Sequence, residues 1–483
     1  MRLANTGESP TRLRVPEQGL LYSFSWGGSH FLFNGENLAL VHVPGHLPAL
    51  LKQHTGKPVV DLLDYVTSTA DAVNGAAIER LVGSHFFLPL DNHKLLRREQ
   101  KRVSAIENNK RLSNIHLQIS SGCNLACRYC YADGGAFKNT QPHGMLSVEK
   151  AARFITFYLD RAEDTCFLDL LGGEPLLNQH LPEIIDLFLA EAAARNKHLR
   201  IQITTNGTRL TTRWAEFLAS RKIRVAVSLD GWANIHDGAR PKRNGGASFA
   251  ESFAGLKHMV EVDRNRVSVR MTCGHHNVHH ILEFYDAICR NMGEIPFDLS
   301  PVIAEPDHAL ALRKDEFKTY ENMLARVEQR KVDRHTHDCE AFVQEFATSE
   351  LSRREAKLFN CHPGFNVLAV TIKGDLYPCV SLMERPEWRM GNISDGNWSF
   401  SPDLQGILLN RGVLQRRKCH SCWAKYLCSG GCLSVNLVNG GNAHEPSPYI
   451  CSMYRSLQAS KLKGYAMGWL MLKSRSVNTD GIG

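Results

Sequence analysis

The run Ser-Gly-Cys-Asn-Leu-Ala-Cys-Arg-Tyr-Cys-Tyr-Ala at residues 121–132 says more about this chain than any other stretch. Its cysteines, Cys123, Cys127 and Cys130, have the spacing C-x3-C-x2-C. Three thiolates this close together can ligate three irons of a cubane cluster and leave the fourth iron open to a substrate or cosubstrate. A closed electron-transfer cluster takes four cysteines, and a structural zinc site takes four nitrogen or sulfur ligands. Tyr129 and Tyr131 flank the last cysteine and are expected to pack over the cluster. Taken alone, the run also fits a chance group of cysteines or an incomplete zinc knuckle.

Seven more cysteines follow a second pattern late in the chain. With Gly374 they read C-x12-G-x4-C, then C-x2-C-x5-C-x3-C, then one further cysteine. Two CxxC-like groups alone would also suit a zinc ribbon. The seven residues are Cys361, Cys379, Cys419, Cys422, Cys428, Cys432 and Cys451.

Apolar strand-like runs alternate with amphipathic helices between the two cysteine groups. This alternation is typical of a parallel α/β barrel, in which the chemistry lies at the carboxyl ends of the strands. The clearest predicted strands are 115–119, 167–171, 200–204, 224–228 and 267–271, with helices over 148–161 and 181–195.

Polar motifs follow several of these strands. The paired glycines of Gly172-Gly173-Glu174-Pro175 let the backbone approach a ligand closely. Short polar side chains at strand tips suit hydroxyl and carboxylate groups, although each of these tips also fits an Asx or Ser/Thr turn. Arg240 can bind a carboxylate through two parallel hydrogen bonds, or can form a surface ion pair. The strand-tip residues are Asn206 in Thr-Thr-Asn-Gly-Thr and Ser228 and Asp230 in Ser-Leu-Asp-Gly.

Taken together, these motifs resemble the radical S-adenosylmethionine (SAM) superfamily, whose signature is C-x3-C-x-aromatic-C, and the late cysteines resemble its SPASM extension. The resemblance covers about residues 112–455. It implies that the open iron binds SAM, that one electron cleaves SAM to a 5′-deoxyadenosyl radical, and that the SPASM region holds two auxiliary clusters, for three [4Fe-4S] clusters in all. It also implies that the Gly-Gly-Glu-Pro turn contacts the SAM amino group, and it places Tyr129, Asn206, Ser228, Asp230 and Arg240 around SAM.

The resemblance also divides the late cysteines between the two auxiliary clusters. Cys361, Cys379 and Cys432 would hold a proximal cluster, with Cys339 as fourth ligand or with an open iron there. Cys166, Cys273 and Cys289 lie in apolar surroundings and are expected to be small core residues. The distal cluster would take Cys419, Cys422, Cys428 and Cys451.

The SPASM branch mainly modifies peptides and proteins, so the expected function is a peptide or protein maturase that forms a thioether or carbon–carbon cross-link. The run Cys-Tyr-Ala-Asp-Gly-Gly-Ala-Phe at 130–137 looks most like cross-linking maturases, such as those of thioether peptides and of a quinohemoprotein amine dehydrogenase subunit. Anaerobic sulfatase maturases commonly have an aspartate base directly after the proximal-cluster cysteine, whereas here Val380 follows Cys379, and valine cannot accept a proton. Formylglycine formation of that kind remains an alternative. A radical SAM enzyme acting on a small molecule and a zinc-binding scaffold without catalysis are the others.

The composition of the chain indicates its cellular compartment and the kinds of partner it could bind. The chain has 483 residues, 14 cysteines and a formal net charge of +8, with 43% hydrophobic and 22% charged residues. Cysteines in this number, without a secretory signal or an apolar run of membrane length, favour metal ligation in a reducing cytoplasm. A basic surface would attract an acidic peptide or a flavodoxin- or ferredoxin-like electron donor. No aromatic–basic platform indicates nucleic-acid binding, and no membrane association is expected.

We expect four regions with the fold class α/β: a partial (β/α)6 radical SAM barrel flanked by a small α+β module and a SPASM iron–sulfur domain. Strand-like runs at 20–26 and 30–43 and helix-like runs at 46–53 and 76–82 suggest an N-terminal module that resembles a winged-helix peptide-recognition domain, or that simply caps the barrel. A charged linker follows at about 91–112. The four regions are 1–111 for the module and linker, 112–330 for the barrel, 331–455 for the auxiliary clusters and 456–483 for a C-terminal helix and tail.

Overall fold

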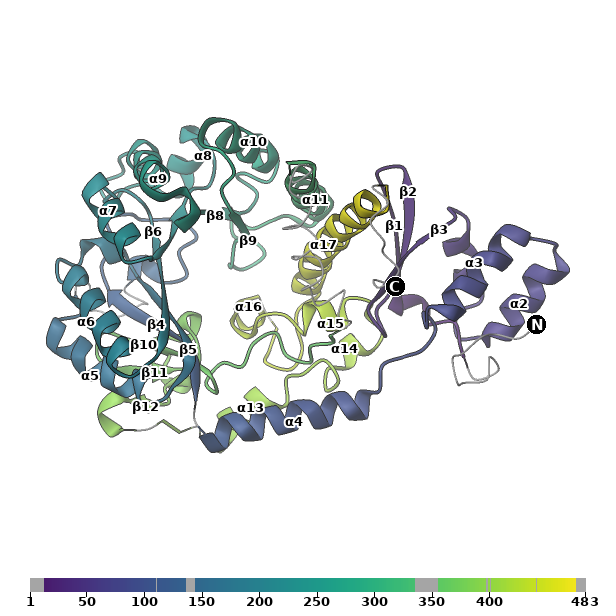
Figure 1. Cartoon of the computed structure of the whole chain (residues 1–483), viewed down its shortest axis with the longest axis horizontal. Helices are drawn as coiled ribbons and strands as arrows, with labels where there is room; N and C mark the ends of the chain where they lie inside the picture. The colour runs from purple at the N-terminus through teal and green to yellow at the C-terminus, as the bar shows by residue number, and fades with distance from the viewer. Residues whose placement is uncertain are drawn as a thin grey trace.

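The central sheet is open and largely parallel. The computed structural model describes residues 13–109, 111–135, 144–334, 355–396, 398–399, 401–439 and 441–474. Nine strands pair in the order β12-β11-β10-β4-β5-β6-β7-β8-β9, and the sheet curves without closing (Figure 1). The mixed α/β fold with a parallel, incomplete barrel is therefore confirmed. The strands are β4 (Leu112–Ser120), β5 (Ala162–Gly172), β6 (His198–Thr205), β7 (Arg224–Ser228), β8 (Val267–Cys273), β9 (Phe297–Pro301), β10 (Val367–Val370), β11 (Asp375–Tyr377) and β12 (Gly391–Asn392).

The late segment that carries Cys361 and Cys379 extends this same sheet. Strand β10 pairs in parallel with β4, and β11 and β12 continue antiparallel from it. The sequence did not predict these strands because they are only two to four residues long and lie far from β4 along the chain. Because β11 runs antiparallel to β10, Tyr377 at the end of β11 lies level with the middle of β4, and Cys379 follows it two residues later.

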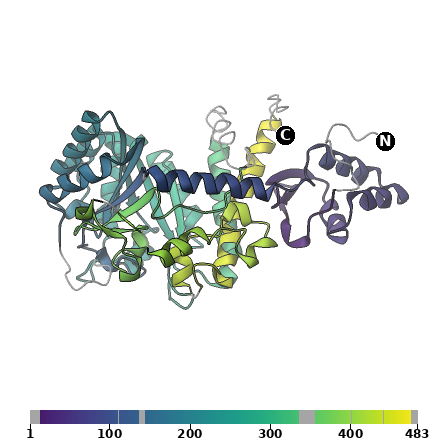
Figure 2. The same cartoon turned by 90° about the horizontal axis from the view of Figure 1, so that it is seen from below.

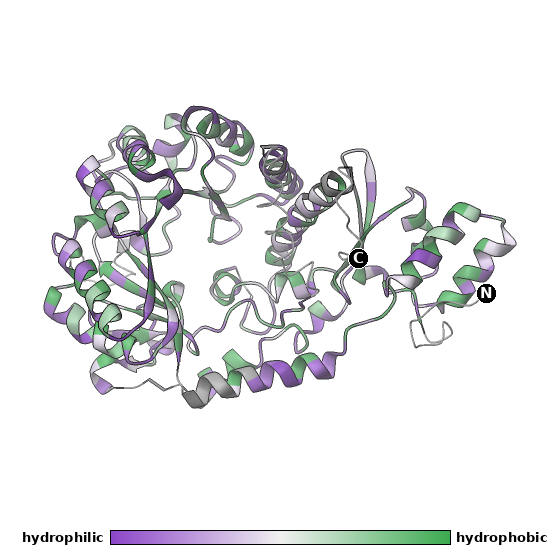
Figure 3. Ribbon diagram, in the orientation of Figure 1, coloured by the Kyte–Doolittle hydropathy of each residue, from purple (hydrophilic) through white to green (hydrophobic). Residues whose placement is uncertain are grey.

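The two faces of the sheet differ because side chains alternate along each strand. On β4, Ile115, Leu117 and Ile119 are fully buried under the covering helices. The other face is polar: His116 of β4 lies 3.2 Å from Asp169 of β5. Figure 3 shows hydrophobic segments on the strands and on the helices that cover them. These helices are α5 (Val148–Leu159), α6 (Leu181–Ala194), α7 (Thr212–Ser220), α8 (Ala233–Ala239), α9 (Phe249–Asp263) and α10 (Ile281–Met292).

Over residues 13–91, the N-terminal module consists of a three-stranded antiparallel sheet and three α-helices. The predicted strand over 30–43 is broken at the turn after Asn34, since Asn-Gly favours a tight reversal. Sequence reasoning missed α2 (Val59–Ser68), and a turn follows α3 (Ala72–Gly83). The elements are β1 (Leu21–Trp26), β2 (Ser29–Asn34), β3 (Ala39–Val43), α1 (Leu47–Gln53), α2 (Val59–Ser68) and α3 (Ala72–Gly83).

A long helix, α4 (Asn92–Asn109), replaces the predicted linker and runs between the module and the central domain (Figure 2). The module nevertheless packs directly on the late cysteine segment. Tyr22 stacks on Trp423 with ring centroids 4.2 Å apart. A Cβ on Gly19 would lie 2.2 Å from the Ser421 carbonyl oxygen, so the two backbones touch there.

Two helices close the side of the molecule beyond β9. Helix α17 (Pro448–Ser474) packs along α11 (Phe317–Arg334), and buried Lys463 bonds Glu321 at 2.7 Å. The sequence predicted the apolar helix but not this partner. None of the helices in the described ranges combines the length and apolar character that a bilayer span requires. The other α-helices in the part of the chain that the structure describes are α13 (Pro402–Leu409), α14 (Arg417–His420), α15 (Lys425–Cys428) and α16 (Leu433–Val438).

Candidate active site

The cysteine loop leaves the carboxyl end of β4 and turns back on itself. The Leu125 N–H donates to Cys123 Sγ at 3.4 Å, and the Gly134 N–H donates to Cys130 Sγ at 3.3 Å. Such N–H groups stabilise a thiolate or a sulfur bound to metal. The loop therefore presents Cys123, Cys127 and Cys130, all partly buried, within one turn of chain.

The pKa values of two of these thiols lie well above the ordinary value for cysteine. Burial, and then Glu174, raises the pKa of Cys123 to about 12. Burial also raises the pKa of Cys127 to about 11, although Arg240 opposes the shift. Thiols of this kind stay protonated near neutral pH unless a metal replaces the proton. The donor set, three sulfurs with supporting N–H groups, fits a [4Fe-4S] cluster. Among the described residues no three His, Cys, Asp or Glu side chains are arranged to hold a single metal ion.

The Gly172-Gly173 turn, at the end of β5, presses against this loop. A Cβ on Gly173 would lie 2.1 Å from the Gly122 carbonyl oxygen and 2.5 Å from that of Gly134. Gly172 has φ +144°, and its Cβ would lie 2.2 Å from the Ser120 carbonyl oxygen. The glycines thus hold both ends of the cysteine loop, a role that the sequence did not assign to them.

Replacing Gly173 by alanine is expected to displace the cysteine loop, because backbone oxygens on two sides leave no room for a methyl group. Anaerobically reconstituted Gly173→Ala should bind several-fold less iron at the loop than the parent. Gly406→Ala is the matched control, since nothing lies within 4 Å of its Cβ. Equal iron content in the two variants would contradict this role for the turn.

Glu174 is fully buried, and protein groups hold its carboxylate. It accepts from Thr205 Oγ1 and from the Asn206 N–H, both at 2.7 Å, and from the Leu176 N–H at 3.1 Å. Burial raises the pKa of Glu174, while these bonds lower it. The carboxylate thus joins the ends of β5 and β6, and the contact with the SAM amino group stays a prediction.

Asn206 and Ser228 lie at neighbouring strand ends, as expected. Asn206 Nδ2 lies 2.9 Å from Asn124 Oδ1 and 3.7 Å from Cys123 Sγ, so its amide lies over the cysteine loop. Ser228 ends β7 and is buried.

Asp230, Arg240 and Tyr129 form one buried network. Arg240 Nε donates to Asp230 Oδ2 at 2.9 Å, and the Tyr129 hydroxyl donates to the same carboxylate. Arg240 also lies over the Tyr129 ring, 5.3 Å from its centroid, and its Nη1 is 3.9 Å from Cys127 Sγ. The ion pair of Arg240, which one of the two alternatives placed at the surface, is thus buried. In this structure the carboxylate that Arg240 binds is that of Asp230.

Two residues of this network were missed by sequence reasoning. The Thr272 N–H donates to Asp230 Oδ1 at 3.0 Å, and His276 Nε2 lies 3.8 Å from Asp230 Oδ2. Thr272 is the next-to-last residue of β8 and His276 follows the strand, so the rule that strand ends carry function could have found them. Burial raises the pKa of Asp230, but Arg240, His276 and Tyr129 together bring it well below its ordinary value of 3.8. The carboxylate is therefore ionised next to the cysteine loop.

The pattern of the radical SAM superfamily matches residues 117–288, which run from β4 through α10 and include all of these groups. The chain contains a radical SAM domain. It is therefore an enzyme, as the sequence predicted.

Similar proteins agree with this identification. A cysteine-type anaerobic sulfatase-maturating enzyme of Clostridium novyi is 26% identical over 348 residues, covering 69% of this chain and 91% of the relative. The structure of anSMEcpe with bound AdoMet and Cp18Cys peptide has a TM-score of 0.59 at 18% identity, covering 75% of this chain and all of that one. Streptococcus suis SuiB bound to S-adenosylmethionine has a TM-score of 0.52 at 15% identity, covering 90% and 99%. At these identities the two structures show a shared fold.

Beyond the radical SAM domain, four late cysteines line one cavity of about 530 Å³. Lys418, Lys425 and Arg455 line it too, and no acidic side chain is among the lining residues. Positive charge around the cavity suits an anionic iron–sulfur cluster. The four cysteines are Cys419, Cys422, Cys428 and Cys451, the set expected for the distal cluster.

A second group forms nearer the radical SAM domain. Burial, and then the charges of Cys432 and Cys361, raises the pKa of Cys379 to about 12, so these three thiols influence one another. Tyr131 lies within electrostatic range of both Cys130 and Cys379. Cys339 lies outside the described residues. Cys166 and Cys273 are fully buried and Cys289 is partly buried, as expected for core residues.

Proposed function

We propose that this protein is a radical SAM maturase that binds three [4Fe-4S] clusters and introduces a thioether or carbon–carbon cross-link into a ribosomally made peptide or protein. The observation that carries the proposal is the sorting of the seven late cysteines into two groups, four lining one cavity and three sharing one electrostatic neighbourhood. The sulfatase-maturating relative and the peptide-bound structure of anSMEcpe support a peptide or protein substrate.

In this proposal Cys123, Cys127 and Cys130 hold the catalytic cluster beside a SAM site formed by the strand ends. When bound, cluster and SAM supply a 5′-deoxyadenosyl radical that removes hydrogen from carbon. The protein's own residues position the reacting groups and shield the cluster from water. Arg240 and Asp230 hold Tyr129 over the cysteine loop, and Asn206 covers Cys123.

The polar inner face of the sheet suits a peptide better than a small apolar substrate. His116 and Asp169, and Arg270 with Asp298 at 2.9 Å, line it with partly exposed charges. The N-terminal module, with its three strands and three helices, is proposed to recognise the peptide. The +8 net charge and the basic rim of the distal site suit an acidic flavodoxin- or ferredoxin-like electron donor in the cytoplasm.

Formylglycine formation is the second candidate, and the Clostridium novyi relative favours it. Val380 argues against it, because no carboxylate follows Cys379 to accept the substrate proton. The mass of the product distinguishes the two reactions. A cross-linked peptide has lost two hydrogens and keeps its sulfur, whereas formylglycine made from cysteine has lost the sulfur. Turnover of free amino acids without a peptide would instead indicate a small-molecule enzyme.

Iron content tests the three clusters. The reconstituted protein is expected to bind about twelve irons, four for each cubane, and to release deoxyadenosine from SAM under dithionite. Cys419→Ala/Cys422→Ala should lose about four of these irons yet still cleave SAM, because the catalytic loop is intact. About four irons in the parent would contradict the auxiliary clusters, and zinc without iron would contradict the whole proposal.

A further inference from the structure

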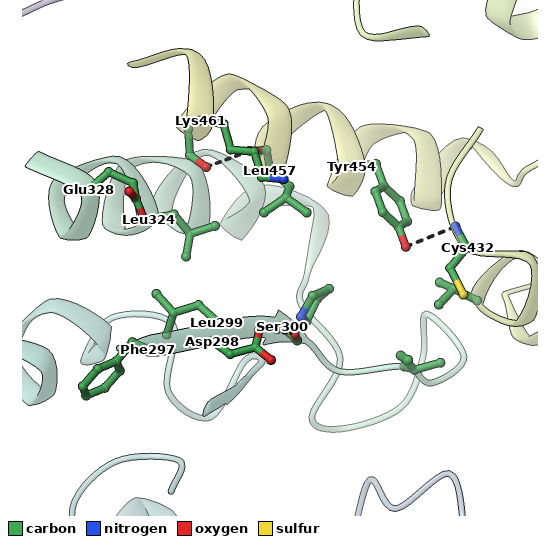
Figure 4. Close-up of a pocket in the computed structure, with 14 residues that line it drawn as sticks. Phe297, Asp298, Leu299, Ser300, Leu324, Glu328, Cys432, Tyr454, Leu457 and Lys461 are labelled. Carbon is green, nitrogen blue, oxygen red and sulfur yellow. Dashed lines mark hydrogen bonds between the residues drawn. The ribbon is translucent and has the colours of Figure 1, made fainter. Parts of the chain in front are cut away.

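A pocket of about 410 Å³ lies between β9 on one side and α11 and α17 on the other. Figure 4 shows the strand facing the two helices across open space, with Tyr454 pointing toward Cys432 at one end. The pocket adjoins the cavity that the four distal cysteines line, and Tyr454 lies in the wall of both. Its walls mix apolar side chains, such as Leu324 and Leu457, with the charged Glu328 and Lys461.

The strand in this wall is the last one of the sheet. In a parallel pair, alternate residues of each strand direct their backbone groups toward the partner. The Val269 N–H donates to the Pro296 carbonyl, and the Val302 N–H donates to the Cys273 carbonyl. The even-numbered residues from 296 to 302 therefore face β8, and the backbones of Phe297, Leu299 and Pro301 face the pocket.

Other contacts agree with this orientation. The Tyr320 hydroxyl, on α11, donates across the gap to the Leu299 carbonyl oxygen at a long 3.5 Å. Pro301 has no N–H, and proline is tolerated on an edge strand where the N–H would face away from the sheet. Within the described residues no other strand pairs with β9.

The pocket lies beside the proximal cysteine group at one end and has Asp298 in its wall. At one end the Cys432 N–H donates to the Tyr454 hydroxyl at 3.3 Å, so the pocket reaches a cysteine of the proximal group. Along its floor Asp298 binds Arg270, which lies on the inner face of the sheet. A chain lying here would pass from the proximal group toward the interior of the open barrel.

We propose that this pocket binds an extended segment of the substrate peptide, which adds to the edge of β9 as a further strand. Backbone groups of Phe297 and Leu299 bond the peptide main chain, and alternate side chains of the peptide face the helices α11 and α17. The five residues of β9 would hold about 16 Å of extended peptide. The inference rests on the proposed function, since it gives the place where the peptide enters.

The test uses a displayed library of random twelve-residue peptides, each with one cysteine, selected on the reconstituted full-length protein. N-methylation of a selected peptide, one residue at a time, should weaken binding with a period of two along three or more residues, about tenfold at each sensitive position. This scan leaves the protein unchanged. Absence of the two-residue period, or of any peptide binding above background, would overturn the pocket assignment.

A variant of the protein tests the same backbone hydrogen bonds by removing the N–H of Leu299. Leu299→Pro removes the outward N–H without removing a bond to β8 and should weaken binding about tenfold, whereas Leu299→Ala keeps the N–H and should stay within about threefold. Equal binding by both variants would overturn the proposal. Iron content and deoxyadenosine release are measured on the same preparations. A parent protein that binds no iron or releases no deoxyadenosine would contradict the proposed function. A parent that passes both measurements but does not bind peptide as expected would contradict only the pocket assignment.

Discussion

Replacing Cys123, Cys127 and Cys130 together by alanine is expected to abolish deoxyadenosine release from SAM and all product formation. The three sulfurs lie within one turn of chain, and the described residues of the loop offer no other thiol to take their place. The measurement is anaerobic assay of deoxyadenosine by chromatography, with product followed by mass spectrometry.

Cys289→Ala is the matched control, because Cys289 is a partly buried core residue of α10 that lies in neither cysteine group. It should keep the parent's iron content and activity. Residual deoxyadenosine from the triple variant, above that of protein without iron, would contradict the assignment of the catalytic loop.

Asp230→Asn is expected to destabilise the protein by about 3 kcal/mol or more, since it leaves the Arg240 guanidinium buried without a counter-charge. The side chains are 0% and 9% exposed, so solvent does little to replace the lost partner. Urea unfolding of the iron-free protein, followed by tryptophan fluorescence, measures the change.

Glu149→Gln provides the comparison, because the Arg153–Glu149 pair is 72% and 77% exposed and its loss should cost less than about 1 kcal/mol. Equal unfolding midpoints for the two variants would contradict a structural role for the buried pair. The pKa of Asp230 is lowered in the folded state, so its stabilising contribution is complete above the unfolded pKa of 3.8 and is lost as the pH falls further.

The sequence predicted the parts of the site that are local in the chain. The cysteine loop and the polar strand ends depend on spacing and on alternating strands and helices, and the structure places them at one end of one sheet. The division of the late cysteines into two clusters stays a prediction from the resemblance, since spacing alone would group Cys432 with the distal cysteines.

Interactions between distant segments could not be predicted in this way. Arg240 was assigned to SAM because nothing in its own segment reveals that Asp230, Tyr129 and His276 surround it. Strands β10 to β12 were missed for the same reason, since their pairing with β4 joins residues about 250 positions apart. Helix α4 was predicted as a linker because its charged residues conceal a helical period.

The packing of the N-terminal module on the late cysteine segment constrains the order in which a working enzyme is assembled. Gln18, Gly19 and Leu21 line the cavity of the four distal cysteines, and Gly35 approaches Trp423 so closely that a Cβ would lie 2.2 Å from its carbonyl oxygen. One wall of the distal site therefore comes from the chain's own N-terminal region. The surroundings of a distal cluster would be complete only after this module, which the ribosome makes first, has docked on a segment that it makes late.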